Sequence, residues 1–391
     1  MPDGREPTEI RVIPSLTEIS AAEWDACAGL ENPTVSHAFL SSMEDSGSVT
    51  AETGWQPQHL CVFDGAKGHD TGKLAAAVPL YLKNNSYGEY VFDWGWADAY
   101  ERAGGRYYPK LQCSIPFTPV TGPRLLIRPD ADPSLMDVLT AGMMQLCDRN
   151  GISSVHVTFL PEDQWQHMGS QDWLLRTGEQ FHWLNNDYET FDDFLGALSS
   201  RKRKNIKKER KKVVEQGLDI RVLSGDDLSE DAWDAFYGFY CNTSDRKWGQ
   251  AYLSREFFSL LSERMADRIA LVMAYDGNVA VAGALNIVGS DAIFGRNWGC
   301  LADYKFLHFE LCYYQAIEFA IRHGLQRVEA GAQGPHKLQR GYLPTHTYSA
   351  HWIRDPGLRG AIEDYLERER GQVDGEIRYL EKHSPFRTES D

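Results

Sequence analysis

The sequence predicts an α/β (α+β) protein made of two similar domains, each a mixed β-sheet flanked by helices. The main observation is an internal duplication, in which residues 60–98 and 271–303 carry the same landmarks in the same order. Each copy opens with an apolar run that ends in Asp-Gly, at residues 64–65 and 276–277. Asp-Gly between apolar runs predicts a hairpin, because Gly accepts the positive φ of tight turns.

The later landmarks of the duplication repeat as well. A strand of small residues comes next, then a strand that enters Trp-Gly, then an amphipathic stretch ending in Gly with Val four residues later. In the two copies these landmarks are residues 75–80 and 281–287, 94–95 and 298–299, and 151–155 and 324–328. Each half is therefore expected to hold a three-stranded meander, a helix and a further strand.

The first half is expected to contain a strand, two helices, the meander, a long loop, a helix, a strand and a helix. The loop is rich in Tyr, Gly and Pro, and loops of this length are usually functional or disordered. Its aromatic residues argue against disorder. The expected ranges are 10–13, 21–29, 37–46, 59–97, 98–124, 133–149, 154–160 and 161–167.

The second half is expected to start with a strand near residue 181 and to close with a long helix from residue 358. Between them, the hydrophobic pattern predicts helices at 191–216, 230–241, 254–266 and 306–323, strands at 218–223, 327–331 and 345–354, and the second meander at 269–300. We expect two domains, residues 1–178 and residues 179–391.

Composition sets broad limits. The 391 residues carry 42% hydrophobic and 25% charged residues, which is ordinary for a globular protein, and a net charge of −16, which argues against general coating of nucleic acid. The seven Cys form no CxxC pair and are expected to be reduced thiols. No apolar stretch reaches the roughly 20 residues of a membrane span. We expect a cytoplasmic protein with no metal site.

A basic run departs from this acidic background. It starts at Arg201, ends at Lys212 and holds nine basic residues and one acid. One interpretation is a solvated helix face. The other is a platform for a polyanion such as a tRNA acceptor stem, a CoA pyrophosphate or a nucleotide-linked substrate, with Lys204 and Lys208 as donor-binding residues.

A second candidate site is the Gly-rich loop that follows the predicted strand 327–331, where α/β folds place their ligand sites. The alternative is a basic turn with no function. The loop supplies the donor-binding candidates Gly331, Gln333, His336 and Arg340, and the catalytic candidates Lys337 and Tyr342.

Two further candidates lie at corresponding strands. Arg296 and Asn297 precede the crossover helix of the second copy, where they would polarise a carbonyl or orient an amine, unless Arg296 is paired within the sheet. The matching region of the first copy combines acids and aromatic rings suited to a polar, amine-bearing acceptor, although its acids would equally suit turn capping. These acceptor candidates are Asp93, Trp94, Trp96, Asp98, Tyr107 and Tyr108.

Four segments carry a family resemblance: residues 92–100 (FDWGWADAY), 115–126 (IPFTPVTGPRLL), 201–222 and 329–342. They resemble the FemAB-like members of the GNAT superfamily over nearly the whole chain. The resemblance implies tandem GNAT-like domains and transfer of an aminoacyl group from aminoacyl-tRNA to an amine of a peptidoglycan precursor. The family's Lys followed by a Gly-aromatic pair is matched at Lys337 and at Gly341-Tyr342.

The chain also departs from this pattern. The long helical arm of FemAB enzymes is absent, and the acyl-CoA phosphate loop of GNAT enzymes is replaced by LADYKFLHFE at residues 301–310. We therefore expect an N-acyltransferase with acyl-CoA or aminoacyl-tRNA as co-substrate, a small-molecule or peptide amine as acceptor, and no tightly bound cofactor. Residues 1–178 would form the acceptor side, and residues 179–391 the acyl-donor and catalytic side. The alternatives are a non-catalytic tandem-GNAT binding protein for a cell-wall or nucleotide-linked ligand, and an RNA-associated factor that uses the basic run alone. The oligomeric state stays open.

Overall fold

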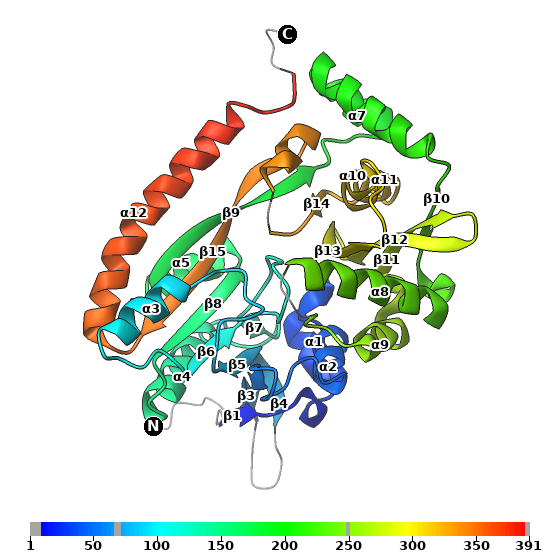
Figure 1. Cartoon of the computed structure of the whole chain (residues 1–391). Coiled ribbons are helices and arrows are strands. Elements are labelled where there is room, and N and C mark those ends of the chain that lie inside the picture. The colour runs from blue at the N-terminus through cyan, green and yellow to red at the C-terminus, as the bar shows by residue number, and fades with distance from the viewer. Residues whose placement is uncertain (1–8, 66–71, 248–250, 333, 388–391) are drawn as a thin grey trace. The chain divides into compact units, whose positions relative to one another are not determined.

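The computed structural model describes residues 9–65, 72–247, 251–332 and 334–387, which belong to two compact units (Figure 1). Unit 1 contains the chain up to Gly178 together with Thr347–Val373. Unit 2 contains Glu179–His346 together with the chain from Asp374. We describe each unit by itself.

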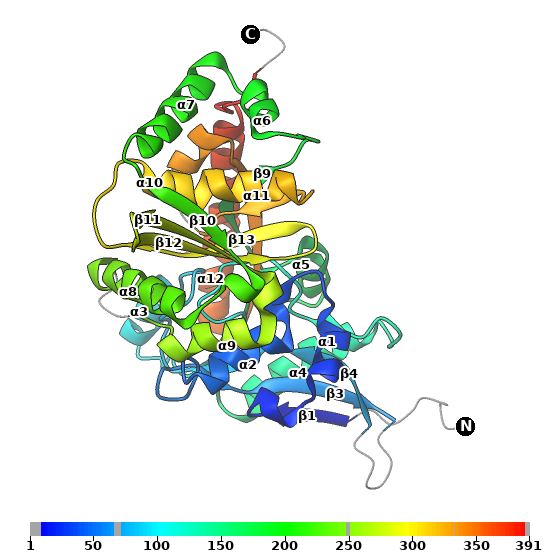
Figure 2. The same ribbon diagram turned by 90° about the vertical axis from the view of Figure 1, so that its right-hand side faces the viewer.

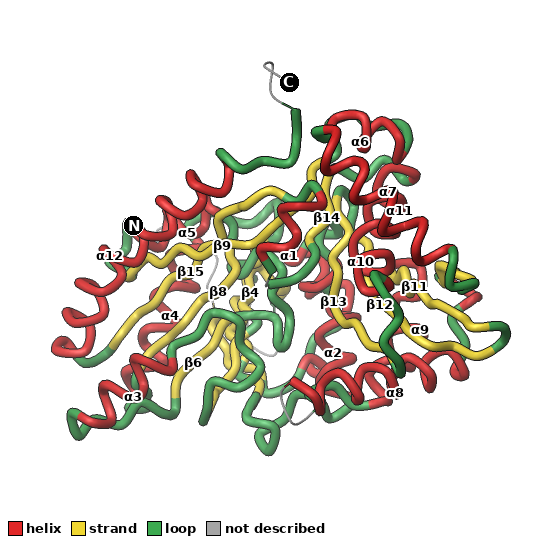
Figure 3. Tube along the Cα trace, turned by 45° about the horizontal axis from the view of Figure 1, so that its top comes forward, coloured by secondary structure: helices red, strands yellow, loops and turns green. Residues whose placement is uncertain are grey.

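Unit 2 is built around an antiparallel meander whose third strand continues through a crossover helix into a parallel strand. The helix contains one π-helical turn, η5. The elements in order are β11 (Ile269–Asp276), β12 (Val279–Val288), β13 (Ala292–Cys300), α10 (Leu307–Phe309), η5 (Glu310–Tyr314), α11 (Gln315–Arg322) and β14 (Arg327–Glu329). Figure 3 shows the meander in yellow beside this helix in red. The turns agree with the sequence: Gly277 (φ 59°) follows β11, and Gly324 (φ 67°) follows the crossover helix.

Two antiparallel strands extend this sheet, β10 (Asp219–Leu223) beside β11 and the end of β9 (Leu174–Leu184) beside β14. Helices cover both faces of this sheet (Figure 2). Ile293 and Ile317 join the core under α11, whereas Phe236 of α8 packs on Gly283. The remaining helices of the unit are α6 (Phe191–Ala197), α7 (Ser200–Val214), α8 (Glu230–Lys247), α9 (Arg255–Met265) and the short η3 (Gly225–Asp227), η4 (Ala266–Arg268) and η6 (Pro335–Arg340).

Unit 1 contains two sheets, with strand orders β1-β3-β4-β7 and β2-β5-β6-β8-β15. Pro79 separates β4 from β5, and because proline has no N–H for a ladder, the chain changes sheet there. The strands are β1 (Glu9–Ile13), β2 (Gln56–Pro57), β3 (His59–Asp64), β4 (Lys73–Val78), β5 (Leu80–Lys83), β6 (Lys110–Cys113), β7 (Leu126–Ile127), β8 (Ser154–Leu160) and β15 (Leu343–Ile353). The helices are η1 (Leu16–Glu18), α1 (Ala21–Ala28), η2 (Pro33–Val35), α2 (His37–Asp45), α3 (Trp94–Arg102), α4 (Leu135–Arg149), α5 (Glu162–Gly169) and the first part of α12 (Pro356–Glu381).

The two units repeat one topology, as the duplication predicts. In unit 1, β5 pairs antiparallel with β6, α4 crosses over, β8 lies parallel to β6, and β15 adds antiparallel to β8. In unit 2, β12, β13, the crossover helix, β14 and β9 repeat this arrangement.

Two expectations differ from the structure. Trp94-Gly95 does not end a strand but begins α3, whose inner face buries Trp96 and Ala97, and the third strand of the first copy is β6, inside the segment expected to be an irregular loop. The second domain was expected to run from 179 to 391 without interruption. Residues 347–373 instead belong to unit 1, because β15 completes the sheet beside β8 and Leu358, Ile362 and Leu366 of α12 join the unit 1 core.

Candidate active site

The candidate site of unit 2 lies where its two parallel strands separate. β13 and β14 are in register at only three positions, from Ala292 opposite Arg327 to Phe294 opposite Glu329. β14 then ends, while β13 continues to Cys300. Within the described residues, no strand pairs with β13 on this side beyond Phe294. The segment of β13 from Gly295 onward therefore faces the loop that follows β14.

A β-bulge in β13 centres on Arg296. Gly295 lies opposite Asn286 and Asn297 lies opposite Leu285, so Arg296 is the additional residue on its strand. A bulge bends the strand and changes the direction of its side chains, and bulges are frequent next to active sites. Arg296, Asn297 and Trp298 are all half-buried. This segment of β13 therefore carries a guanidinium, an amide and an indole, none of them fully buried.

The loop after β14 contains the 3-10 helix η6. Gly334 precedes it at φ 122°, and a Cβ there would lie 2.4 Å from the His336 ring, so the turn requires glycine. Lys337 is 1% exposed, and its Nζ donates a 2.6 Å hydrogen bond to the carbonyl oxygen of Gly331. Burial lowers the Lys337 pKa to about 8. Lys337 is a catalytic candidate from the sequence, but in the structure it is buried and stabilises the loop through its bond to Gly331.

His336 is the exposed titratable group of this loop. Its Nε2 lies 2.8 Å from the hydroxyl of Tyr313, which is buried on the π-helical turn η5. Burial, and then the cations Arg340 and Lys337, lower the His336 pKa. His308 lies 6.3 Å from His336 and 5.2 Å from Trp298 between ring centroids. A histidine that is neutral at pH 7 is thus held near the accessible part of β13, and π-helical turns are frequent at functional sites.

The basic helix α7 is connected to the same loop. Glu209, the acid within the basic run, accepts hydrogen bonds from Arg340 at 2.8 and 3.2 Å and from the Tyr314 hydroxyl. Arg340 also lies 3.4 Å above the Phe309 ring. Arg340 is 7% exposed and neutralised, so it supports the loop rather than offering a free charge.

The opposite face of α7 is open to solvent. Ile206 and Val213 are buried, and Arg210 binds Glu310 and Glu318 of the crossover helix. The exposed cations are Arg201, Lys204, Lys207, Lys208, Lys211 and Lys212. Of these, Lys207 contacts Asp192, and Lys211 and Lys212 contact Glu215. The helix is docked and still presents a cationic face.

Two other predicted site residues have different outcomes. Tyr342 is fully buried in the core of unit 2, where its hydroxyl donates to the Tyr313 carbonyl at 3.3 Å. Gln333 lies outside the described residues.

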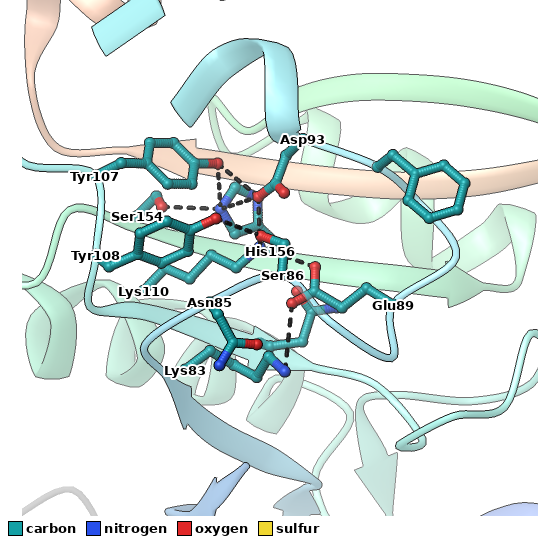
Figure 4. Close-up of polar contacts among 12 residues, drawn as sticks. Lys83, Asn85, Ser86, Glu89, Asp93, Tyr107, Tyr108, Lys110, Ser154 and His156 are labelled. Atoms are coloured by element: carbon teal, nitrogen blue, oxygen red, sulfur yellow. Dashed lines mark hydrogen bonds and ion pairs between the residues drawn. The ribbon is translucent and has the colours of Figure 1, made fainter. Parts of the chain in front are cut away.

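Two of the six acceptor candidates of unit 1, Asp93 and Tyr107, belong to a buried ionic network (Figure 4). Lys110 donates from Nζ to Ser86 at 2.7 Å, to Glu89 at 2.8 Å and to Asp93. Although burial opposes ionisation of both groups, Glu89 and Asp93 raise the Lys110 pKa, and Lys110 lowers that of Asp93. Lys83 lies 3.7 Å from Glu89 and 3.5 Å from the centre of the Trp55 ring, and burial lowers its pKa to about 7.

A chain of hydrogen bonds continues from Asp93. Tyr107 donates to Asp93 at 2.7 Å, so its oxygen can accept from His156 Nε2 at 3.2 Å. The Nδ1 atoms of His156 and His351 are 2.7 Å apart, and His351 Nε2 lies 3.0 Å from the Ser349 hydroxyl. An ionised Asp93 therefore favours one tautomer of each ring. Burial, with Lys110, lowers the His156 pKa to about 3, and burial lowers that of His351 as well.

The other acceptor candidates are distributed around this network. Trp96 is buried, and its ring centre lies 5.0 Å from that of His351. Tyr108 is half-buried and its hydroxyl lies 2.9 Å from Ser86. Trp94 and Asp98 are exposed, and Asp98 pairs with Arg102 at 2.7 Å.

In unit 1 the parallel strands β6 and β8 also separate, but residues 122–124 lie beside the end of β8. Beyond Cys113 of β6, the Gly122 amide donates to the Phe159 carbonyl at 3.0 Å. Arg124 is fully buried, and its Nε donates to the Thr158 carbonyl at 2.9 Å and its Nη2 to Val120 at 2.7 Å. Residues 122–124 of unit 1 thus occupy the place corresponding to the one where, in the described part of unit 2, no strand pairs with β13.

Several members of these sites were missed by sequence reasoning. Glu209, Tyr313, Lys110 and His156 are single polar residues within helical or strand patterns, and nothing at those positions marks them before the fold is known. A weak signal was present at Glu209, since it is the acid among nine basic residues. In the described part of the chain, no helix is long and apolar enough to cross a membrane. The described residues also contain no group of three or more His, Cys, Asp or Glu that could hold a metal ion.

Comparisons with known proteins agree with this architecture. The family model FemAB-like, described as peptidoglycan biosynthesis/recognition, matches residues 15–388. The solved structure of FemX is 11% identical, covers 91% of this chain and 100% of its own, and gives a TM-score of 0.51. The C-terminal domain of a putative lysylphosphatidylglycerol synthetase from Agrobacterium fabrum is 9% identical, covers 90% and 97%, and gives 0.50. No curated protein matches the chain. The predicted tandem GNAT-like fold class is confirmed.

Proposed function

The chain belongs to the FemAB-like family, and from this premise we propose that it is an N-acyltransferase whose chemistry takes place in unit 2. The donor is an activated acyl or aminoacyl group, carried by CoA or tRNA. The acceptor is an amine of a peptidoglycan-type or other peptide compound. The family description supports the peptidoglycan acceptor class, and the geometry of unit 2 supports the reaction type.

One observation carries the proposal, namely the divergence of β13 from β14 beside a loop with a neutral, exposed histidine. An extended donor amide can add to a strand at such a place through main-chain hydrogen bonds. The matching place in unit 1 is filled by residues 122–124, which supports unit 2 as the donor side. Acyl transfer needs the two reactants held in one orientation, and a strand provides this with little loss of entropy at the reacting step.

The side chains near β13 suit the charges that develop during transfer. Attack of the amine on the donor carbonyl places negative charge on the carbonyl oxygen, which Arg296 and Asn297 would stabilise as hydrogen-bond donors. Lys337 would contribute a positive potential from beneath the loop without contacting the substrate, since it is buried.

The attacking amine must lose a proton. His336 is exposed, and its lowered pKa keeps it neutral at pH 7, so it can accept that proton as a general base. Tyr313 is a positioning residue that holds the ring through its hydroxyl. The proton then passes to the leaving alcohol of tRNA or the leaving thiol of CoA.

The test incubates the full chain with a muropeptide amine acceptor and, separately, with acetyl-CoA and with aminoacyl-tRNA, and follows the acylated product by mass spectrometry. We expect product with one donor class, and a loss of about 10²- to 10⁴-fold in kcat for His336→Ala. His323→Ala is the matched control, because His323 is exposed at the end of the crossover helix and bonds its own helix.

Three outcomes would contradict the proposal. Binding of a donor or acceptor without turnover would favour a binding protein for a cell-wall or nucleotide-linked ligand. Salt-dependent binding of tRNA with no transfer, unaffected by changes in residues 331–342, would favour the RNA-associated factor. Equal activity of the His336→Ala and His323→Ala proteins would exclude His336 as the base.

A further inference from the structure

Unit 1 presents three large aromatic side chains to solvent within eight residues. Tyr87 is 60% exposed, Phe92 44% and Trp94 41%. The rings of Tyr87 and Trp94 are in edge-to-face contact, with centroids 5.1 Å apart and an interplanar angle of 65°. We call the three residues the aromatic platform. Exposed aromatic side chains that lie in contact form an apolar surface suited to a ligand, whereas singly scattered ones are normal on a protein surface.

Two basic side chains, buried Lys83 and half-buried Arg176, hold the backbone of the aromatic platform. Lys83 Nζ donates to the Tyr87 carbonyl at 2.9 Å, and Arg176 Nη1 donates to the Phe92 carbonyl at 2.9 Å. Asp93, next to Trp94, is fixed by Lys110 (Figure 4). Burying ionic groups is costly, and removing one partner would leave a charge unpaired. The loop thus has a strongly constrained backbone while its aromatic side chains point outward.

Polar groups flank the exposed rings. Trp94 begins α3, so Asp98, four residues later, lies on the same face of that helix. Asp98 and its ion-pair partner Arg102 are 66% and 73% exposed. An indole with a carboxylate and a guanidinium on one helix face offers an apolar surface beside strong hydrogen-bonding groups.

We propose that the aromatic platform binds a pyranose ring in the saccharide part of the acceptor. One face of a pyranose consists of C–H groups, which pack on the negative face of an aromatic ring, and its hydroxyls then meet the carboxylate and guanidinium at the edge. This inference rests on the proposed function for its choice of acceptor, but the platform itself is observed independently of the transfer site.

The flanking charges favour a sugar over a lipid surface. Peripheral membrane sites combine aromatic residues with an excess of Lys and Arg, because most membrane surfaces are anionic. Here the exposed acids Asp98 and Glu101 are matched by the exposed cations Arg102 and Arg106, with no cationic excess, and the whole chain carries −16. A carboxylate beside an indole repels anionic lipid and accepts hydrogen bonds from hydroxyls.

The experiment uses the full chain and two probes: the disaccharide N-acetylglucosaminyl-N-acetylmuramic acid bearing a stem peptide, and the same peptide without sugar. Affinity is measured by calorimetry, and contact with the sugar C–H protons by saturation-transfer NMR. For Trp94→Ala and Tyr87→Ala we expect at least fivefold weaker binding of the disaccharide-peptide, loss of saturation transfer to the sugar, and no change for the sugar-free peptide. Trp94→Phe should retain most of the binding.

Tyr379→Ala is the matched control, since Tyr379 is also 60% exposed but lies on α12. Circular dichroism and the Tm confirm that each variant is folded. Equal affinity of the Trp94→Ala and Tyr379→Ala proteins for the disaccharide-peptide would overturn the proposal. So would a Trp94-dependent sedimentation with phosphatidylglycerol vesicles in place of sugar binding. If the sugar contact is absent while transfer to the sugar-free peptide persists, only this inference fails; if transfer is absent while the sugar binds, only the proposed function fails.

Discussion

Arg340, on the loop after β14, forms a two-pronged ion pair with Glu209 of the basic helix α7. Its Nη2 lies 2.8 Å from one carboxylate oxygen and its Nε 3.2 Å from the other, with most of both side chains buried. Such paired geometry fixes two elements relative to each other within unit 2. The ion pair therefore holds the helix that carries the cations against the loop that carries His336.

Removing Arg340 should destabilise the protein. Arg340→Ala leaves the Glu209 carboxylate largely buried with only Tyr314 as a remaining partner, and losses of this kind are about 3 to 5 kcal/mol. Urea unfolding would measure the change. Lys207→Ala breaks an exposed contact with Asp192 and serves as the control, with little effect expected. A small change for Arg340→Ala would mean that the pair does not support the loop.

Lys110 should be equally important in unit 1. Lys110→Met leaves Asp93 and Glu89 buried without their main cation, which predicts a loss of about 3 to 5 kcal/mol in unfolding free energy. Adding Asp93→Asn should recover part of the loss, because one unpaired charge disappears. A double-mutant cycle on the two positions checks this, and additivity would show that the pair is not coupled.

The His156–His351 pair predicts sensitivity to acid. Both rings have pKa values lowered in the folded state, that of His156 to about 3, against about 6.5 when unfolded. Below pH 6.5 the unfolded chain binds more protons, so stability is complete above that pH and falls as pH decreases, by up to about 1.4 kcal/mol per pH unit for each histidine. Unfolding curves between pH 7.5 and 5 measure the slope. A His156→Gln, His351→Gln protein should lose that part of the slope, and an unchanged slope would place the acid sensitivity elsewhere.

The lowered His336 pKa predicts the pH profile of catalysis. The base is active when neutral, so kcat/KM should decrease at acid pH, and the midpoint of this decrease should lie below pH 6.5. Lys337→Met removes one of the cations that lower this pKa, and the limb should move to higher pH. Rates measured from pH 5 to 8 on both proteins test this. A shift of the acid limb to lower pH in the variant would contradict the assignment of His336 as the base.

Charge reversal at Lys204 and Lys208 should distinguish a tRNA donor from a CoA donor. If α7 binds phosphates, Lys204→Glu with Lys208→Glu weakens donor binding. For a tRNA donor, each lost contact lowers the magnitude of the negative slope of log affinity against log salt by about 0.7 to 0.9. A CoA donor carries few phosphates and gives a much shallower slope. An unchanged affinity in the double variant would identify α7 as a solvated face.

Most of the fold could be predicted from the sequence because the residues that specify turns and elements are local and occur in both copies. Asp276-Gly277, Gly324 and the apolar periods each specify a turn or an element from a few adjacent residues. The exception, α3, shows the limit. Trp94-Gly95 has the same letters as the strand end at Trp298-Gly299, but its neighbour Asp93 is tied to Lys110 from another strand, and that contact is not visible in local sequence.

The loop after β14 and the strand with Arg296 were chosen as site candidates because α/β sheets place ligands at strand ends, and their part in a site stays a prediction. Burial decides the roles, and a single sequence does not show which lysine of a Gly-rich loop turns inward. Lys337 and Tyr342 are internal, and His336, predicted for donor binding, is the exposed group. The partners of Asp93 and Tyr107 lie up to 49 residues away along the chain, as for His156.

The return of residues 347–373 to unit 1 has a consequence for synthesis on the ribosome. Unit 1 lacks β15 until the ribosome has translated all of Glu179–His346, so the edge of β8 remains without its neighbour during that time. An uncovered strand edge is a template for aggregation. Dividing the gene at codon 178 would leave the first product without β15, and a nascent chain that stalls before β15 would expose the edge of β8 to chaperones.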